Sequence, residues 1–223
     1  MAMFPGLPGS GKTSIIENVA NAESMFVINN DKLRGMWKGN EYSYSQVLDQ
    51  KVIYGSSLVM FDYVFGPCKF NVCVDEVLVS AEERALYIER ARKLDPYACI
   101  ICVPVLTTPE ECIRRRRLAV DITHEETFEK DKAAYVPDYW TDVVLLKAAA
   151  WDMPSSNEDI DWIATPEQFL KRLSSLPGKR IKDLAQLEVS NETLKEWSDE
   201  SLGELQKAST FTPDDAKMSS FYA

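Results

Sequence analysis

The stretch from Gly6 to Thr13 constrains the fold of this chain more than any other feature. It reads Gly-Leu-Pro-Gly-Ser-Gly-Lys-Thr, the pattern G-x-x-x-x-G-K-[ST], and it lies between an apolar run at residues 1–4 and an amphipathic run at residues 12–22. Where this pattern joins a strand to a helix it binds phosphate, because glycines let successive backbone N–H groups converge on an anion. The positive end of the following helix faces the same anion. We therefore predict a phosphate-binding loop (P-loop); a glycine-rich tight turn is the plainer alternative.

The residue types in the loop also predict which groups it binds. Lys12 can reach the terminal phosphates of ATP, and the Thr13 hydroxyl can be a ligand of Mg²⁺. The residues expected to contact the nucleotide are, within this stretch and at the position that follows it, Gly6, Gly9, Ser10, Gly11, Lys12, Thr13 and Ser14.

Apolar runs alternate with amphipathic ones over the first three quarters of the chain. The predicted strands are residues 1–4, 25–29, 70–74, 98–105 and 160–164, and the predicted helices are 12–22, 49–64, 81–94, one that starts at Pro109 and one over 166–173. Strands separated by helices need crossover connections, so the sheet should be mainly parallel. We expect an α/β P-loop domain over residues 1–176, and a small helical, partly flexible appendage over the more polar residues 177–223.

The charge balance limits the kind of partner. The 223 residues contain 35 acidic and 25 basic side chains, a net charge of −10, which is the opposite of the basic surface of a protein that coats nucleic acid. The five cysteines are expected to be reduced thiols, with Cys99 and Cys102 packed in a buried strand, and no apolar run approaches the ~20 residues of a membrane span. These features predict a cytoplasmic protein without a membrane segment, and they do not indicate an oligomeric state.

Acidic residues follow the second and third predicted strands. The second strand leads into Asp31-Lys32-Leu33-Arg34, and the third ends at Asp75. Because parallel strands end at one edge of a sheet, both acids should lie near the phosphate loop. A carboxylate there can accept a proton from an attacking hydroxyl, and Arg34 can hold a phosphate of the acceptor. Asp31 as a helix cap and Asp75 as a strand-end cap are the structural alternatives.

The chain resembles the 5′-kinase domain of phage-type polynucleotide kinases and related P-loop kinases over about residues 1–173. The resemblance rests on the P-loop, the Asp31–Arg34 box, the Tyr42-Ser43-Tyr44 segment before a long helix, the strand that ends at Asp75, and residues 80–84. It implies a P-loop kinase fold, with Asp31 as the general base on a 5′-hydroxyl, Arg34 on the 3′-phosphate of the acceptor, and Asp75 lining the acceptor site. One departure is that Glu76 and Val77 follow Asp75, where the family commonly has D-x-N.

Four consecutive arginines, residues 114–117, fall where that family carries a lid that clamps the ATP phosphates, here about residues 109–135. Successive residues on a helix are about 100° apart, so only some of the four can face the nucleotide. The resemblance aligns Arg115 with the first lid arginine of the family. The position of the family's second lid arginine is occupied here by Ala119, and Arg117 is expected to take over the role of that second arginine.

These observations predict a kinase that transfers the γ-phosphoryl group of ATP to a hydroxyl, with the 5′-OH end of RNA or DNA as the favoured acceptor. Lys12, Asp31, Arg34, Asp75 and Arg115 are the expected catalytic groups. Two alternatives remain: a P-loop kinase for a small metabolite, nucleotide or nucleotide sugar, like the zeta-toxin kinases, and a non-catalytic nucleotide-binding module that docks a partner.

Overall fold

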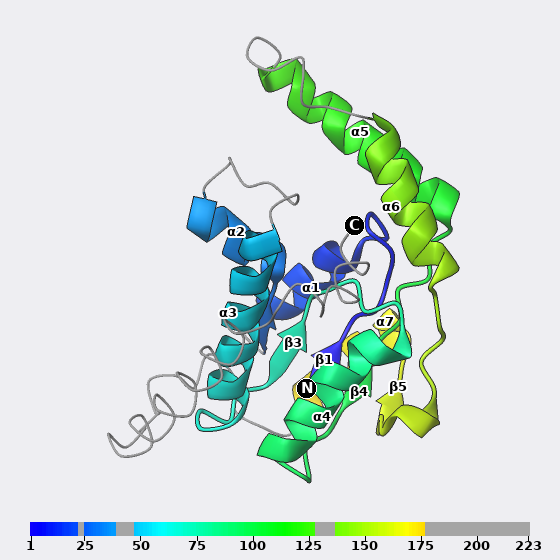
Figure 1. Ribbon diagram of the computed structural model, residues 1–223. Coiled ribbons are helices and arrows are strands. Elements are labelled where there is room, and N and C mark those ends of the chain that lie inside the picture. The colour runs from blue at the N-terminus through cyan, green and yellow to red at the C-terminus, as the bar shows by residue number, and fades with distance from the viewer. Residues whose placement is uncertain (22–24, 39–46, 128–136, 177–223) are drawn as a thin grey trace.

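Five short parallel strands form one sheet in the computed structural model, which describes residues 1–21, 25–38, 47–127 and 137–176 (Figure 1). The strands are β1 (Ala2–Met3), β2 (Phe26–Ile28), β3 (Val72–Val74), β4 (Ile101–Cys102) and β5 (Trp162–Ile163), in the order β2-β3-β1-β4-β5. The helices are α1 (Lys12–Asn21), α2 (Asn30–Lys38), α3 (Val47–Phe65), α4 (Ala81–Leu94), α5 (Pro109–Thr127), α6 (Pro137–Ala149) and α7 (Pro166–Arg172). Two 3-10 turns, η2 (Ser156–Glu158) and η3 (Leu173–Ser175), complete the described elements. The predicted α/β fold with a parallel sheet is confirmed.

The sheet is buried on both faces, which is the usual state of a parallel sheet with crossover helices. Successive strand residues alternate between the faces: Met3 and Val74 belong to a core built with α3 and α4, whereas Ala2 and Cys73 belong to a core built with α1 and α7. The cysteines in the described residues are free, and Cys102 lies in the α3–α4 core as expected from the sequence.

Side-chain caps start several helices where the sequence predicts. The backbone N–H of Glu83 donates to the Ser80 hydroxyl, and the Glu83 carboxylate accepts from the Ser80 N–H, a reciprocal pair that starts α4. Thr165 and Gln168 form the same arrangement at the start of α7. Helices α2 and α6 are absent from the sequence-based prediction; α2 is short and polar, with nine residues.

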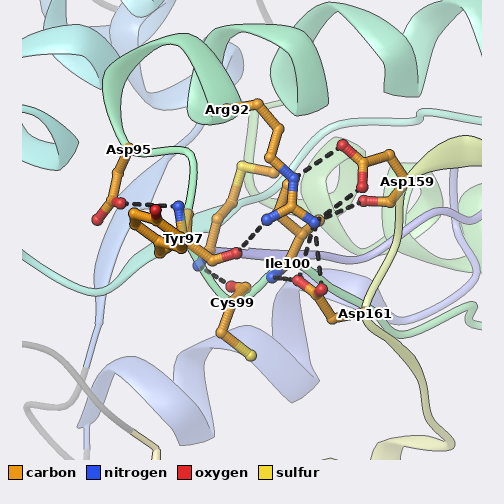
Figure 2. A network of polar contacts seen from close by, with 9 residues as sticks. Arg92, Asp95, Tyr97, Cys99, Ile100, Asp159 and Asp161 are labelled. Carbon is orange, nitrogen blue, oxygen red and sulfur yellow. Dashed lines mark hydrogen bonds and ion pairs between the residues drawn. The ribbon is translucent and has the colours of Figure 1, made fainter.

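Arg92 of α4 ties the far edge of the sheet together (Figure 2). Its guanidinium donates to Asp159, Asp161 and the Ala98 carbonyl, and Asp161 also accepts the N–H of Ile100 at 2.6 Å. These residues precede β4 and β5, so the network lies at the amino ends of the strands and leaves the carboxyl ends for other contacts.

Helices α5 and α6 pack against each other and extend away from the sheet (Figure 1). Helix α5 covers residues 109–127 of the predicted lid, and α6 follows the lid. The lid residues 128–135 lie outside the described part of the chain, as do Tyr42–Tyr44 and the predicted appendage at 177–223. Among the described helices, none combines the length and the apolar composition needed to cross a bilayer.

Candidate functional site

The loop between β1 and α1 has the backbone conformation that its glycines allow. Gly9 and Gly11 have φ angles of 84° and 98°, a region that other residues rarely adopt. A Cβ atom on Gly9 would lie 2.7 Å from the Cys112 carbonyl oxygen of α5, so only glycine fits there. The prediction of a glycine-dependent loop between a strand and a helix is confirmed, and Thr13 and Ser14 are exposed in the first turn of that helix.

Lys12 is folded back onto its own loop. Its ammonium group donates to the carbonyl oxygens of Gly6, at 2.8 Å, and Leu7, at 3.0 Å, and the residue is only 8 % exposed. Burial lowers the pKa of Lys12 from 10.5 to about 8, and the negative charge of Asp75 opposes this shift. Within the described residues, the buried hydroxyl of Ser10 has no hydrogen-bond partner in this loop. The loop therefore offers a buried ammonium group, that of Lys12, and an unpaired hydroxyl, that of Ser10, and both can bind the oxygens of a phosphate.

Asp75 lies next to the P-loop because β3 pairs directly with β1. Its Oδ2 atom accepts hydrogen bonds from the Thr13 hydroxyl, at 3.3 Å, and from the Asn29 side-chain amide, at 2.5 Å. Burial raises the pKa of Asp75, and the bond from Asn29 is the main opposing cause. A hydroxyl and a carboxylate this close are the hard oxygen donors that Mg²⁺ prefers, so the residues present fit this metal.

Helix α2 brings the Asp31–Arg34 box to the same edge of the sheet. The side-chain oxygen of Asn29 accepts the N–H of Lys32 at 2.8 Å and caps the helix. The cap is therefore Asn29, and not Asp31, which was the structural alternative for that residue. Asp31 lies in the first turn with 57 % of its side chain exposed, and its Oδ1 atom is 2.6 Å from Nη1 of Arg34, whose side chain is 10 % exposed. The two residues thus form an ion pair one helical turn apart.

Glu76 is a polar group at the site to which the sequence analysis gave no role. This half-buried residue accepts the backbone N–H of Asn30 at 2.8 Å and so links the end of β3 to the first residue of α2. Burial raises the pKa of Glu76 to about 8; the Asn30 hydrogen bond and the Arg34 charge oppose the shift, whereas the charges of Asp31 and Asp75 add to it. In the sequence, the feature that could have indicated this role is that Glu76 directly follows Asp75.

The start of α5 forms one wall of the P-loop. Nη1 of Arg115 donates to the Ser10 carbonyl oxygen at 3.0 Å, and the Thr107 hydroxyl donates to the same oxygen at 2.9 Å. Nε of Arg115 donates to Glu111 at 2.7 Å, which holds the guanidinium beside the loop.

The other arginines of the cluster diverge around the helix. Arg116 has its Cγ atom 3.1 Å from the position of a Cβ on Gly9, and its charge contributes to the lowered pKa of Lys12. Arg114 pairs with Glu111, and Arg117 donates to the Thr141 hydroxyl of α6 at 3.4 Å. The structure thus places Arg115 and Arg116 beside the loop, whereas the contact of Arg117 is with α6. That Arg115 and Arg117 bind ATP stays a prediction. Only tertiary packing could identify Arg116, because the four arginines are adjacent in sequence.

Comparison with known proteins agrees with this geometry. The sequence model of one family, described as the AAA domain, matches residues 1–137, and no curated protein sequence matches the chain. Among solved structures, a provisionally named kinase from Chloroflexus aurantiacus is 12 % identical with a TM-score of 0.50, covering 84 % of this chain and 97 % of its own.

Two further solved structures are similar. A protein of the PezAT chromosomal toxin–antitoxin system of Streptococcus pneumoniae is 13 % identical with a TM-score of 0.50, covering 93 % of this chain and 85 % of its own. The APS kinase CysC of Mycobacterium tuberculosis, solved with AMPPNP and APS, is 19 % identical with a TM-score of 0.47, covering 78 % of this chain and 96 % of its own. At these identities the similarity to the structures with TM-scores of 0.50 establishes a shared fold.

Proposed function

The chain belongs to the AAA domain family, and we propose that it is a kinase that transfers the γ-phosphoryl group of ATP to a hydroxyl group, with the 5′-OH end of a polynucleotide as the favoured acceptor. The observation that carries this proposal is the edge of the sheet at which the P-loop, Asp75 and the Asp31–Arg34 pair meet. Strand β3 lies between β1 and β2, so one carboxylate contacts both the loop that follows β1 and the residue that follows β2. A nucleotide-binding module would not need a second acid and an arginine beside its phosphate site.

On the donor side, the backbone N–H groups of the loop and the Lys12 ammonium bind the β- and γ-phosphates of ATP. Thr13 and Asp75 would hold Mg²⁺, which would supply positive charge to neutralise the phosphate oxygens. Arg115, fixed beside Ser10, supplies a further positive charge near the transferred group. These contacts position the γ-phosphorus and stabilise its equatorial oxygens in the transition state.

On the acceptor side, Asp31 takes the proton of the attacking hydroxyl as the new oxygen–phosphorus bond forms. The bond from the γ-phosphorus to the β–γ bridging oxygen breaks, and ADP carries away that electron pair. Arg34, held by Asp31, binds a phosphate of the acceptor, which is the 3′-phosphate in a polynucleotide end.

A small-metabolite acceptor is the second candidate, and the charge of the site favours it. The exposed carboxylate of Asp31 lies at the acceptor edge, and the chain carries a net charge of −10. A neutral hydroxylated compound meets less repulsion there than a strand of phosphates does.

The test is transfer of labelled γ-phosphate from ATP to a panel of acceptors. The panel contains 5′-OH RNA and DNA oligonucleotides, each with and without a 3′-phosphate, and small sugars and alcohols, with Lys12→Ala as the control. Label on the oligonucleotides, increased by the 3′-phosphate, supports the polynucleotide proposal, and label on the small compounds alone supports the second candidate. Stoichiometric ATP binding without any transfer would contradict both and favour the nucleotide-binding module.

A further inference from the structure

The side chain of Asn29 makes two hydrogen bonds in opposite senses. Its amide nitrogen Nδ2 donates to Oδ2 of Asp75 at 2.5 Å, and its amide oxygen Oδ1 accepts the backbone N–H of Lys32 at 2.8 Å. The residue is 8 % exposed and follows β2 directly. One buried amide therefore spans the end of β3 and the first turn of α2.

The two groups that this amide joins belong to opposite halves of the site. Asp75 also accepts the Thr13 hydroxyl, so it belongs to the half that faces the nucleotide and its metal. Helix α2 carries Asp31 and Arg34, so its first turn belongs to the half that faces the acceptor.

Among side chains of this size, the carboxamide is the one that can make both bonds. An aspartate accepts but cannot donate when ionised, and a serine caps a helix well but is too short to reach across to the next strand. The backbone supports the same alignment, because the N–H of Asp75 donates to the Ile28 carbonyl at 2.9 Å and the N–H of Asn30 donates to Glu76.

We propose that Asn29 is a positioning residue that holds the Asp75 carboxylate beside the Thr13 hydroxyl and, through the same amide, aligns the first turn of α2 with it. The proposal rests on the proposed function, in which Thr13 and Asp75 hold Mg²⁺. In this proposal Asn29 joins the part of the site that would hold the metal to the helix that carries Asp31 and Arg34, and it has no direct role in binding either substrate.

The experiment separates the two bonds by substitution. Asn29→Ser keeps a capping oxygen for α2 but loses the donor to Asp75, whereas Asn29→Ala loses both. The matched control is Asn71→Ser, which changes an asparagine at the amino end of the neighbouring strand β3. Calorimetric titration with AMPPNP, in the presence and absence of Mg²⁺, gives the magnesium-dependent gain in affinity for each protein, and thermal unfolding gives its stability.

We expect Asn29→Ser to reduce the magnesium-dependent gain by about 10-fold or more, as loss of groups that orient metal ligands commonly does. Its affinity for AMPPNP without Mg²⁺ should stay close to wild type, and its Tm should fall less than that of Asn29→Ala, which also loses the cap of α2. A wild-type gain that survives in Asn29→Ser, or falls equally in Asn71→Ser, would overturn the role of Asn29. A wild-type protein whose AMPPNP affinity does not respond to Mg²⁺ would instead overturn the metal half of the proposed function.

Discussion

Asp31 and Arg34 lie one turn apart on α2, and the ion pair between them keeps the carboxylate at the site while more than half of it remains exposed. Solvent screens the pair at its Asp31 end, and an asparagine there still offers an oxygen to the Arg34 guanidinium, so the loss of the charge should cost little stability, about 0–1 kcal/mol. The substitution Asp31→Asn should therefore leave the fold intact while removing the proton acceptor.

For Asp31→Asn we predict a loss of kcat on the order of 10²–10⁴, the usual contribution of a general base, with the KM for ATP nearly unchanged. Steady-state kinetics on the acceptor identified by the panel measure both quantities. Asp142→Asn, on the exposed side of α6, is the control and should behave like wild type. A variant that keeps its kcat would show that Asp31 only supports the helix start.

Glu76 makes the stability of this protein depend on pH. Its pKa is about 8 in the folded protein against 4.5 ordinarily, so the folded state holds a proton that the unfolded state has lost over this range. Stability therefore falls as the pH rises from about 4.5 to about 8.

The variant Glu76→Gln keeps an oxygen for the Asn30 N–H but cannot ionise. We predict that its Tm exceeds that of wild type at about pH 8–9 and that the difference shrinks toward pH 5. Melting curves across this range, with the exposed Glu110→Gln as the control, measure the effect. Parallel Tm curves for wild type and Glu76→Gln would mean that the carboxylate ionises normally in the folded protein.

At the scale of elements, α5 contributes to the site mainly through its first two turns. Thr107, just before the helix, and Arg115 both donate to the Ser10 carbonyl, and Cys112 packs against Gly9. The rest of α5 extends away from the sheet beside α6 (Figure 1). The P-loop is thus braced by a helix that also packs against its hairpin partner α6.

A buried ion pair fixes the start of α4 to the 3-10 turn η2. The fully buried guanidinium of Arg84 donates to the Glu158 carboxylate through Nε at 2.6 Å and through Nη2 at 2.9 Å, and to the Leu78 carbonyl. Lys147 of α6 pairs with Glu83 in the same region, so this corner also anchors the α5–α6 hairpin.

We predict that Glu158→Met destabilises the protein by about 3 kcal/mol or more, because it leaves the Arg84 charge buried with weaker compensation. The double variant Arg84→Met/Glu158→Met should be less destabilised, since it buries no unpaired charge. Urea unfolding of both proteins compares the two free energies. A double variant that is less stable than Glu158→Met would indicate that Arg84 stabilises the fold mainly through the Leu78 carbonyl.

At the scale of the whole molecule, the net charge of −10 limits how a polynucleotide can bind. A basic surface that follows a strand of phosphates conflicts with this balance, so the acceptor should be held only at its end. The affinity for nucleic acid should then depend weakly on salt.

We predict a salt dependence equivalent to about one to three phosphate contacts for a 5′-OH oligonucleotide. Fluorescence anisotropy of a labelled oligonucleotide over a series of KCl concentrations measures the slope. Oligonucleotides of increasing length serve as the internal control, because their slope should not grow with length. A steep slope that increases with length would indicate an extended binding surface.

Much of the fold could be predicted because its signals are local. The apolar runs, the cap at Ser80 and the proline-led starts of α5 and α7 depend on neighbours within a few residues, and these elements lie where the sequence predicts. The position of α2 beside β3 could not be predicted in this way, since the bond from the Asn30 N–H to Glu76 joins residues far apart in the sequence.

The sequence by itself determined the parallel α/β class and the P-loop with Lys12 and Thr13, because periodicity and loop chemistry are properties of adjacent residues. It also identified Asp31, Arg34 and Asp75 as site residues, whose catalytic roles stay predictions. Only the tertiary structure decided that Asn29 links the last of these to α2, that Glu76 shares the site, and that Arg116 lies by the loop beside Arg115. These contacts join segments tens of residues apart, and the strand order β2-β3-β1, which places Asn29 and Glu76 at one edge of the sheet, is a property of the folded chain.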